Sequence, residues 1–301
     1  MAFGFDVAAL PAYTDQLSLD LISKVVLKTD LLDYIDLRSG FTSGTVAINL
    51  VDAALPVSAL SCGWTSDGQV TYTQVNVIIE SLQSKTEMCV EDLRATYQSA
   101  FMNAGTGNDF IPFENVISES YSDKLRKYNE GFLINGSAGG AMTGLKGQIT
   151  AANGANLQGG VIAAWTAANA FEQALDLYDA IDESVKDRDD LIMVVSPDAY
   201  RALVRALVAQ NLYHFNSVES NDILILPGTN VTVVKSSGLV GSDNKFAGPG
   251  KMILAATGLT DELDNFRFFY DEAADVMKFR AAWRLGVGVG EVNVFATNDM
   301  A

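Results

Sequence analysis

The strand-rich stretch over residues 39–84 constrains the fold most, because it has no helix of its own to cover it. It is rich in Ser, Thr and Val and contains no Lys or Arg. Residues 45–51 and 70–79 both have the composition of β-strands, and the second segment alternates apolar with polar residues. Turn residues at Ser66-Asp67-Gly68 separate them. The pattern predicts a long two-stranded excursion with an irregular tip around residues 53–64.

The apolar side chains of this excursion need a partner from outside it. We therefore expect contacts with a neighbouring subunit from Ile48, Leu50, Trp64, Val75, Val77 and Ile79. Composition points the same way, since 49% of the residues are hydrophobic and only 19% are charged. Soluble domains usually carry about 25% charged residues. Apolar surface that is reserved for a partner accounts for this excess.

An amphipathic helix is predicted over residues 14–29, ahead of the excursion. Leu17, Leu21 and Val25 recur at four-residue steps, and Thr14 suits the N-cap. Because it lies next to a strand-rich region rather than in a helical block, we expect an arm. Its apolar stripe is the second predicted inter-subunit contact.

The longest helical pattern covers residues 114–133, after a shorter helix expected over 91–103. Its apolar positions recur every three or four residues: Ile117, Tyr121, Leu125, Tyr128 and Phe132. We expect this stripe to face a sheet that includes strands from residues 266–285.

The second half of the chain alternates helices with strands, which predicts an α/β layer. After a glycine-rich loop at 134–160 come a helix near 166–182 and a strand at 191–195. A further helix starts at Ser196-Pro197-Asp198 and runs to about 208, since serine is a good N-cap and proline suits the first turn. More strands are expected at residues 223–226, 231–234, 252–255, 266–270, 276–285 and 291–296.

Charge and residue inventory exclude several classes of protein. The net charge of −17 argues against tight, sequence-independent binding to nucleic acid. No apolar run approaches the roughly 18–20 residues that span a bilayer, and no secretion signal is recognised, so we expect no membrane. One histidine and two cysteines cannot build a histidine-rich or cysteine-rich metal site. Cys62 and Cys89 are either free thiols or a disulfide that forms late.

Two glycine-rich motifs fall short of nucleotide-binding sites. Gly286-Val287-Gly288-Val289-Gly290 is followed by a strand instead of a helix, which favours a glycine kink in a sheet. In Gly139–Lys146 a leucine stands where a phosphate-binding loop needs its lysine. No nucleophile motif accompanies His214. We therefore expect no cofactor, no metal and no enzymatic activity.

The order of these elements resembles the major capsid protein of tailed bacteriophages, which has the Hong Kong 97-like fold. Short motifs are also similar to those of some phage capsid proteins: Ser61-Cys62-Gly63-Trp64, Ser66-Asp67-Gly68, Thr73-Gln74, Cys89-Val90-Glu91-Asp92-Leu93, Ile111-Pro112-Phe113-Glu114, Val195-Ser196-Pro197-Asp198-Ala199-Tyr200 and Gly286. The resemblance implies an α+β fold with four parts. These are an N-terminal arm (1–36), an extended E-loop (37–84), a peripheral P-domain (85–133 and 259–286, with spine helix 114–133) and an axial A-domain (134–258 and 287–301).

The resemblance also implies a function and partners. The chain would self-assemble into the hexamers and pentamers of an icosahedral shell around double-stranded DNA, which it encloses without sequence-specific binding. It would work with a separate scaffolding protein, a portal and cement or decoration proteins. Its location would be the virion capsid, after assembly in the host cytoplasm. Because residues 39–84 contain no lysine, we expect no isopeptide cross-link from the E-loop.

Two alternatives remain open at this point. One is an encapsulin-type compartment of the same fold, which would hold a cargo enzyme instead of DNA. The other is an α/β enzyme with a binding loop, which would be a compact monomer with a discrete pocket.

Overall fold

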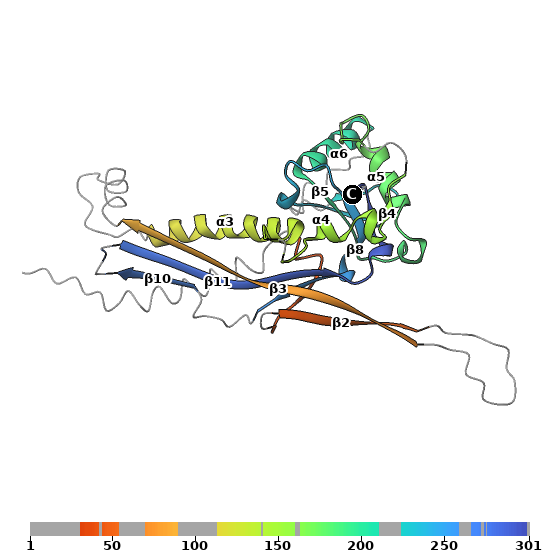
Figure 1. Cartoon of the computed structure of the whole chain (residues 1–301). Coiled ribbons are helices and arrows are strands. Elements are labelled where there is room, and N and C mark those ends of the chain that lie inside the picture. The colour runs from red at the N-terminus through yellow and green to blue at the C-terminus, as the bar shows by residue number, and fades with distance from the viewer. Residues whose placement is uncertain are drawn as a thin grey trace, which may run out of the picture.

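The computed structural model describes residues 31–41, 44–53, 70–89, 113–139, 141–159, 163–210, 224–258, 266–271, 274 and 276–299. Several predictions lie outside the described residues: the two helices expected over 14–29 and 91–103, with Leu17, Leu21 and Val25 in the first, and also Cys62, Trp64 and His214. The described residues form two sheets, one long helix and several shorter helices (Figure 1).

The first sheet, called the long sheet, runs along the whole molecule. Its strand order is β1-β9-β11-β3-β2, with β10 paired to β11, and only the β1–β9 pair is parallel. The bounds are β1 Asp36–Arg38, β2 Gly44–Ala53, β3 Val70–Cys89, β9 Ile253–Thr257, β10 Phe266–Asp271 and β11 Val276–Val289. The two strands predicted in the excursion are therefore present, and the second continues for 20 residues.

Helix α3, Phe113–Asn135, covers one face of the long sheet and confirms the predicted long helix (Figure 1). The ring of Tyr121 stacks on that of Phe279 in β11, with 4.7 Å between ring centroids. The indole nitrogen of Trp283 donates a hydrogen bond of 2.9 Å to Oδ1 of the buried Asn129. Leu125 is buried in the same cluster as these β11 residues.

The far end of the predicted stripe also packs, with one exception. Phe132 is buried, whereas Tyr128 is 54% exposed and touches Trp283 only edge to face. The helix therefore packs on the sheet as expected, with Tyr128 at the rim of the contact.

The second sheet has the strand order β4-β12-β8-β5-β7-β6. Its strands are β4 Asn156–Leu157, β5 Leu191–Val195, β6 Leu224–Ile225, β7 Thr232–Lys235, β8 Phe246–Pro249 and β12 Ala296–Thr297. Helix α5, Ala170–Asp179, packs on β8 and β12, and α6, Pro197–Ala209, packs on β7 and on α5. The start of α6 is as predicted, since Oγ of Ser196 accepts from the amide of Ala199 at 3.3 Å. The predicted α/β layer is thus confirmed.

Short helices connect these elements. They are α4 Leu145–Gln148 and the 3₁₀ turns η2 Ala151–Asn153, η3 Glu183–Val185, η4 Ser237–Leu239, η5 Gly250–Met252 and η7 Val292–Val294.

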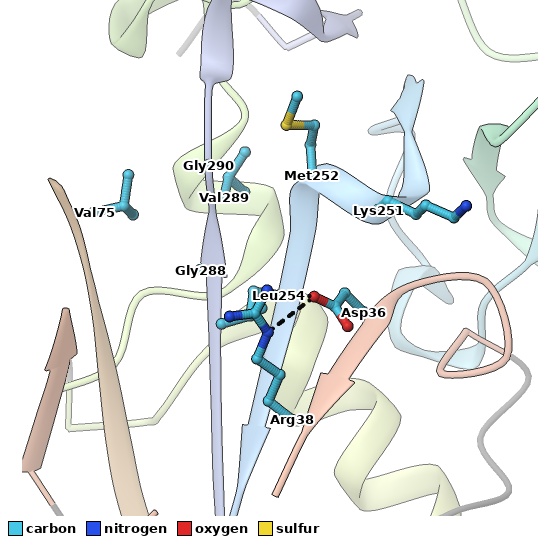
Figure 2. Close-up of a pocket in the computed structure, with 9 residues that line it drawn as sticks. All are labelled: Asp36, Arg38, Val75, Lys251, Met252, Leu254, Gly288, Val289 and Gly290. Atoms are coloured by element: carbon cyan, nitrogen blue, oxygen red, sulfur yellow. Dashed lines mark hydrogen bonds and ion pairs between the residues drawn. The ribbon is translucent and has the colours of Figure 1, made fainter. Parts of the chain in front are cut away.

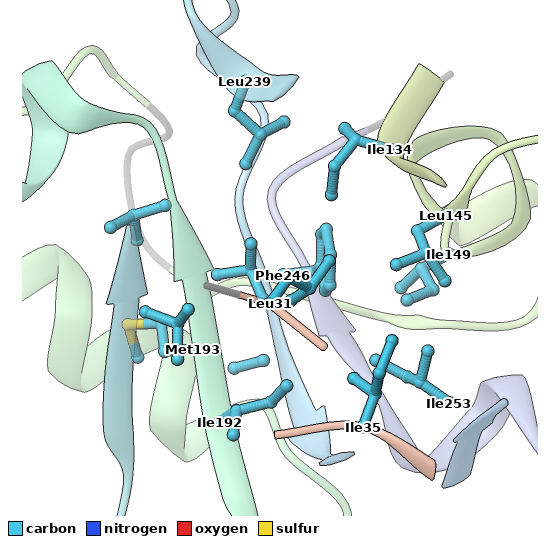
Figure 3. Packing of buried hydrophobic residues seen from close by; sticks show 14 of the residues in the cluster. Leu31, Ile35, Ile134, Leu145, Ile149, Ile192, Met193, Leu239, Phe246 and Ile253 are labelled. Atoms are coloured by element: carbon cyan, nitrogen blue, oxygen red, sulfur yellow. The ribbon is translucent and has the colours of Figure 1, made fainter. Parts of the chain in front are cut away.

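One apolar core joins the two sheets. Ile134 at the end of α3, Leu145 of α4 and Ile253 of β9 meet Phe246 of β8 and Met193 of β5 (Figure 3). All five side chains are at most 2% exposed. The spine helix and the second sheet therefore belong to one packed body.

A polar contact fixes the junction between α3 and the second sheet. The buried carboxylate of Glu130 accepts from the amide of Ser237 at 3.1 Å and from its hydroxyl at 2.6 Å. Asn135 donates to the carbonyl of Gly238 at 2.9 Å. A Cβ at Gly238 would lie 2.9 Å from the carbonyl oxygen of Glu130, so only glycine permits this approach.

The glycine motif at 286–290 lies within and just after β11 and serves packing. The glycines alternate with Val287 and Val289, which point into the main core. A Cβ at Gly288 would lie 2.4 Å from Cγ2 of Val77, and one at Gly286 would lie 2.5 Å from the carbonyl oxygen of Ile78. Because side chains alternate between the two faces of a strand, the two valine side chains pack in the core. The glycines on the opposite face leave room for β3.

Several strands differ from what the sequence predicts. The strand expected over 291–296 is wrong, since η7 occupies most of it and β12 begins only at Ala296. The sequence analysis did not predict strands β1, β4 and β8. The boundary placed at residue 258 follows β9, yet β9 pairs with β1 and β11 of the long sheet.

The α3 interface gives a first prediction. Leu125→Asp would place an unpaired charge in an apolar layer and should lower the free energy of unfolding by roughly 3 kcal/mol or more. Lys124→Asp, on the exposed side of the same helix, should change it by less than about 0.5 kcal/mol. Urea denaturation of the unassembled chain measures both. Equal midpoints for the two variants would contradict this packing.

The close approach of β3 and β11 gives a second prediction. Gly288→Ala should cost about 1–3 kcal/mol through overcrowding, and Val77→Ala on the order of 2 kcal/mol through lost packing. The double variant should cost clearly less than the sum, because Val77→Ala makes room for the new methyl group. Gly159→Ala, which meets nothing within 4 Å, is the matched control. Strict additivity would show that the two residues do not compete for space.

Candidate inter-subunit surface

The hairpin of β2 and β3 projects from the body (Figure 1). Its pairing runs from Gly44 opposite Ile79 to Ala53 opposite Val70. Tyr72 is 73% exposed and Val70 50%. A two-stranded ribbon is marginally stable in water when nothing packs on it, so this projection is the first candidate for contact with another chain.

The predicted contact residues of the hairpin have different environments. Ile48 and Leu50 lie in β2, in register with Val75 and Thr73, but their side chains lie outside the described part of the structure. Val75 is half-buried. The contact of these three residues with a neighbour stays a prediction.

For Val77 and Ile79 the prediction of an inter-subunit contact is wrong. Val77 is 0% and Ile79 4% exposed within their own chain. They form a small cluster with Leu254 and Ala256 of β9, against which Phe41 also packs. The sequence pattern missed this because their partners lie about 175 residues further along the chain.

The face of the long sheet that is turned away from α3, here called the distal face, is the second candidate. On β3 the residues paired with the α3-facing side of β11 are partly buried, whereas the alternate residues are all exposed. The distal residues are Ser81, Gln83, Lys85 and Glu87 on β3 and Lys278, Arg280, Ala282 and Arg284 on β11. Sequence analysis missed this face, although charged and polar residues at every second position signalled it.

Charge on the distal face is arranged in rows across the strands. Lys278 lies opposite Glu87 and donates to the carboxylate of Asp271 at 2.5 Å, which raises the pKa of Lys278. The next row is different, since Lys85 lies directly opposite Arg280 and both are exposed.

A small pocket opens on the distal face near the base of the hairpin (Figure 2). Its lining consists of Asp36, Arg38, Val75, Lys251, Met252, Leu254, Gly288, Val289 and Gly290. Arg38 pairs with Asp36 at 3.0 Å. The volume of about 60 Å³ is far below the roughly 300 Å³ at which ligand pockets begin. It has room for a side chain rather than a cofactor.

The described residues contain no group of three His, Cys, Asp or Glu side chains that could hold a metal ion. No helix among them is long and apolar enough to cross a membrane. Lys146 lies within the short helix α4, which begins at the buried Leu145.

No protein-family model and no curated protein matches the chain. The capsid of the native GTA particle matches with a TM-score of 0.58 and 13% identity, over 90% of this chain and 89% of that chain. Gordonia phage Cozz matches with 0.59 and 11%, over 90% and 85%. The SrpI encapsulin complex of Synechococcus elongatus PCC 7942 matches with 0.55 and 12%, over 92% and 89%.

In each case the match covers 90% or more of this chain. At this level of identity the likeness concerns the fold. The chain therefore has the α+β Hong Kong 97-like fold that its sequence resembles.

Proposed function

We propose that this chain is the structural major capsid protein of a tailed double-stranded DNA bacteriophage. The observation that carries the proposal is the hairpin of β2 and β3, which projects with Tyr72 and Val70 exposed, in a fold shared with phage capsids. A projection that its own subunit does not cover needs neighbours, and a closed shell supplies a neighbour to every copy. The role is structural, and no residue is assigned to catalysis.

The parts of the chain then take the following roles. Residues 37–84 are the E-loop that reaches a neighbour, and residues 1–36 are the arm. The P-domain combines α3 with the long sheet, and the A-domain is built on the second sheet. Copies form hexamers and pentamers with a separate scaffolding protein, a portal and cement proteins, assembled in the host cytoplasm. The net charge of −17 keeps the enclosed DNA from sticking to the wall.

An encapsulin-type shell is the second candidate, favoured by the match to the SrpI encapsulin at a TM-score close to those of the phage capsids. The contents of the particle separate the two. Native particles of a phage capsid should hold nuclease-protected double-stranded DNA, whereas an encapsulin should hold a cargo protein. Cryo-electron microscopy of native particles and analysis of their contents decide between them.

The exposed hairpin gives a third prediction. Tyr72→Asp should leave the unfolding midpoint of the isolated chain unchanged, because Tyr72 is 73% exposed, and should lower the yield of particles at least tenfold. Tyr72→Phe keeps the apolar ring and should assemble normally. Sedimentation and negative-stain microscopy measure the yield. Equal yields for both variants would count against a hairpin that contacts neighbours.

The absence of lysine from residues 39–84 gives a fourth prediction. The shell should be held by non-covalent contacts. Arg38, just before this stretch, stays protonated and cannot act as an amine nucleophile. Lys85, just after it, lies at the base of the loop, in the ladder of β3 with β11, and we expect it not to reach the acceptor on another subunit. Boiled and reduced particles should run as one band near 32.2 kDa on a denaturing gel. A ladder of pentamers and hexamers would contradict it.

A further inference from the structure

The row of Lys85 and Arg280 on the distal face is an electrostatic anomaly. The two residues are directly opposite each other in the pairing of β3 with β11, and both are exposed. Like charges in this position destabilise a sheet. Arg267 of β10 occupies the register position opposite Arg280 on the other side. Such a row is unexpected in a chain with 37 acidic and only 20 basic residues.

The neighbouring row shows how the subunit balances charge elsewhere on the same face. Lys278 has Asp271 at 2.5 Å and Glu87 opposite. Among the described residues, neither Lys85 nor Arg280 has an ion pair. Within the described residues of this face, the positive charge without an ion pair is therefore carried by Lys85 and Arg280, on two strands about 5 Å apart.

We propose that this row is a docking site for a carboxylate-rich surface of a second copy of the chain. The inference rests on the proposed function, because a shell brings many copies side by side. Charge complementarity identifies the partner, since a chain of net charge −17 presents excess carboxylates to its neighbours. Residues 176–190 alone contain seven acidic and two basic residues, and five of the acidic side chains are exposed.

The shape and composition of the row favour a protein over nucleic acid. Glu87 lies two residues from Lys85 on the same face, and a carboxylate in that place repels phosphates. Proteins that bind a nucleic-acid backbone neutralise several phosphates in succession along it. A short row of positive charge beside a row of mixed charge is complementary to a protein surface on which the charges alternate in sign. Such a surface also fixes the register of the two copies.

A zero-length carbodiimide reaction tests the proposal on assembled particles. The reagent joins an amine to a carboxylate only where the two already touch. Particles are assembled from equal amounts of ¹⁴N-labelled and ¹⁵N-labelled chain, cross-linked and digested, and peptides are identified by mass spectrometry. We expect Lys85 joined to Asp or Glu in mixed-isotope pairs. Lys278 joined to Asp271 within one chain is the internal control.

Variants give a second readout with a matched control. Lys85→Gln combined with Arg280→Gln should lower particle yield at least fivefold and flatten its salt dependence, without lowering the unfolding midpoint. Lys278→Gln removes one cation that is already paired and should change the yield less than twofold.

The outcomes separate this proposal from the proposed function. If particles form normally but Lys85 is cross-linked only within its own copy or to a different protein, the docking site is overturned. The proposed shell function then still stands. A chain that forms no particles would overturn both.

Discussion

The pairing of β3 with β11 is the interaction on which the rest of the structure depends. It runs in unbroken antiparallel register from Cys89 opposite Val276 to Ile79 opposite Gly286. Because β3 is one continuous strand of 20 residues, the same strand then leaves the body and pairs with β2. The direction of the hairpin is therefore set by the ladder inside the body, and no separate hinge is needed to aim it.

The two faces of this ladder make different contacts, because successive side chains of a strand point to opposite faces of the sheet. One face receives α3, where Tyr121 stacks on Phe279 and Trp283 bonds to Asn129. The distal face carries the small cluster around Val77 at one end and the row of Lys85 and Arg280 at the other. One strand thus contributes to the core, to the root of the hairpin and to a charged surface.

The sequence predicted correctly those helices whose formation depends on residues close together in the chain. The N-cap at Ser196 and the apolar stripe from Tyr121 to Phe132 predicted helices that the structure confirms. The burial of Val77 depends on β9, which reaches β3 only through the fold, so no local pattern contains it. Polar residues at every second position of β3 were a local signal for the distal face. Which charges share a row across the strands is known only once the register is known.

The burial of Lys245 is a second feature that the sequence alone could not predict. A lysine is rarely fully buried without a partner, yet Lys245 is 1% exposed. Its ammonium group donates to the carbonyl of Asp243 at 2.5 Å and lies 5.2 Å from the centre of the Trp165 ring. Burial lowers the pKa of Lys245. Trp165 is 80 residues away in the chain, so the environment that tolerates this cation is a product of the second sheet's assembly.

Because the body is packed within one chain and the hairpin projects from it, we expect folding of the body to precede assembly. The core between the sheets and the contact of α3 with the long sheet are complete within one chain, so the body can fold before copies meet. Repulsion between copies of net charge −17 is screened beyond about 8–10 Å at physiological salt. Attraction to the basic row is screened over the same distance, so it acts only once surfaces are almost in contact. Its effect is then to select orientation and register among neighbours, while burial of the apolar hairpin supplies most of the free energy of association.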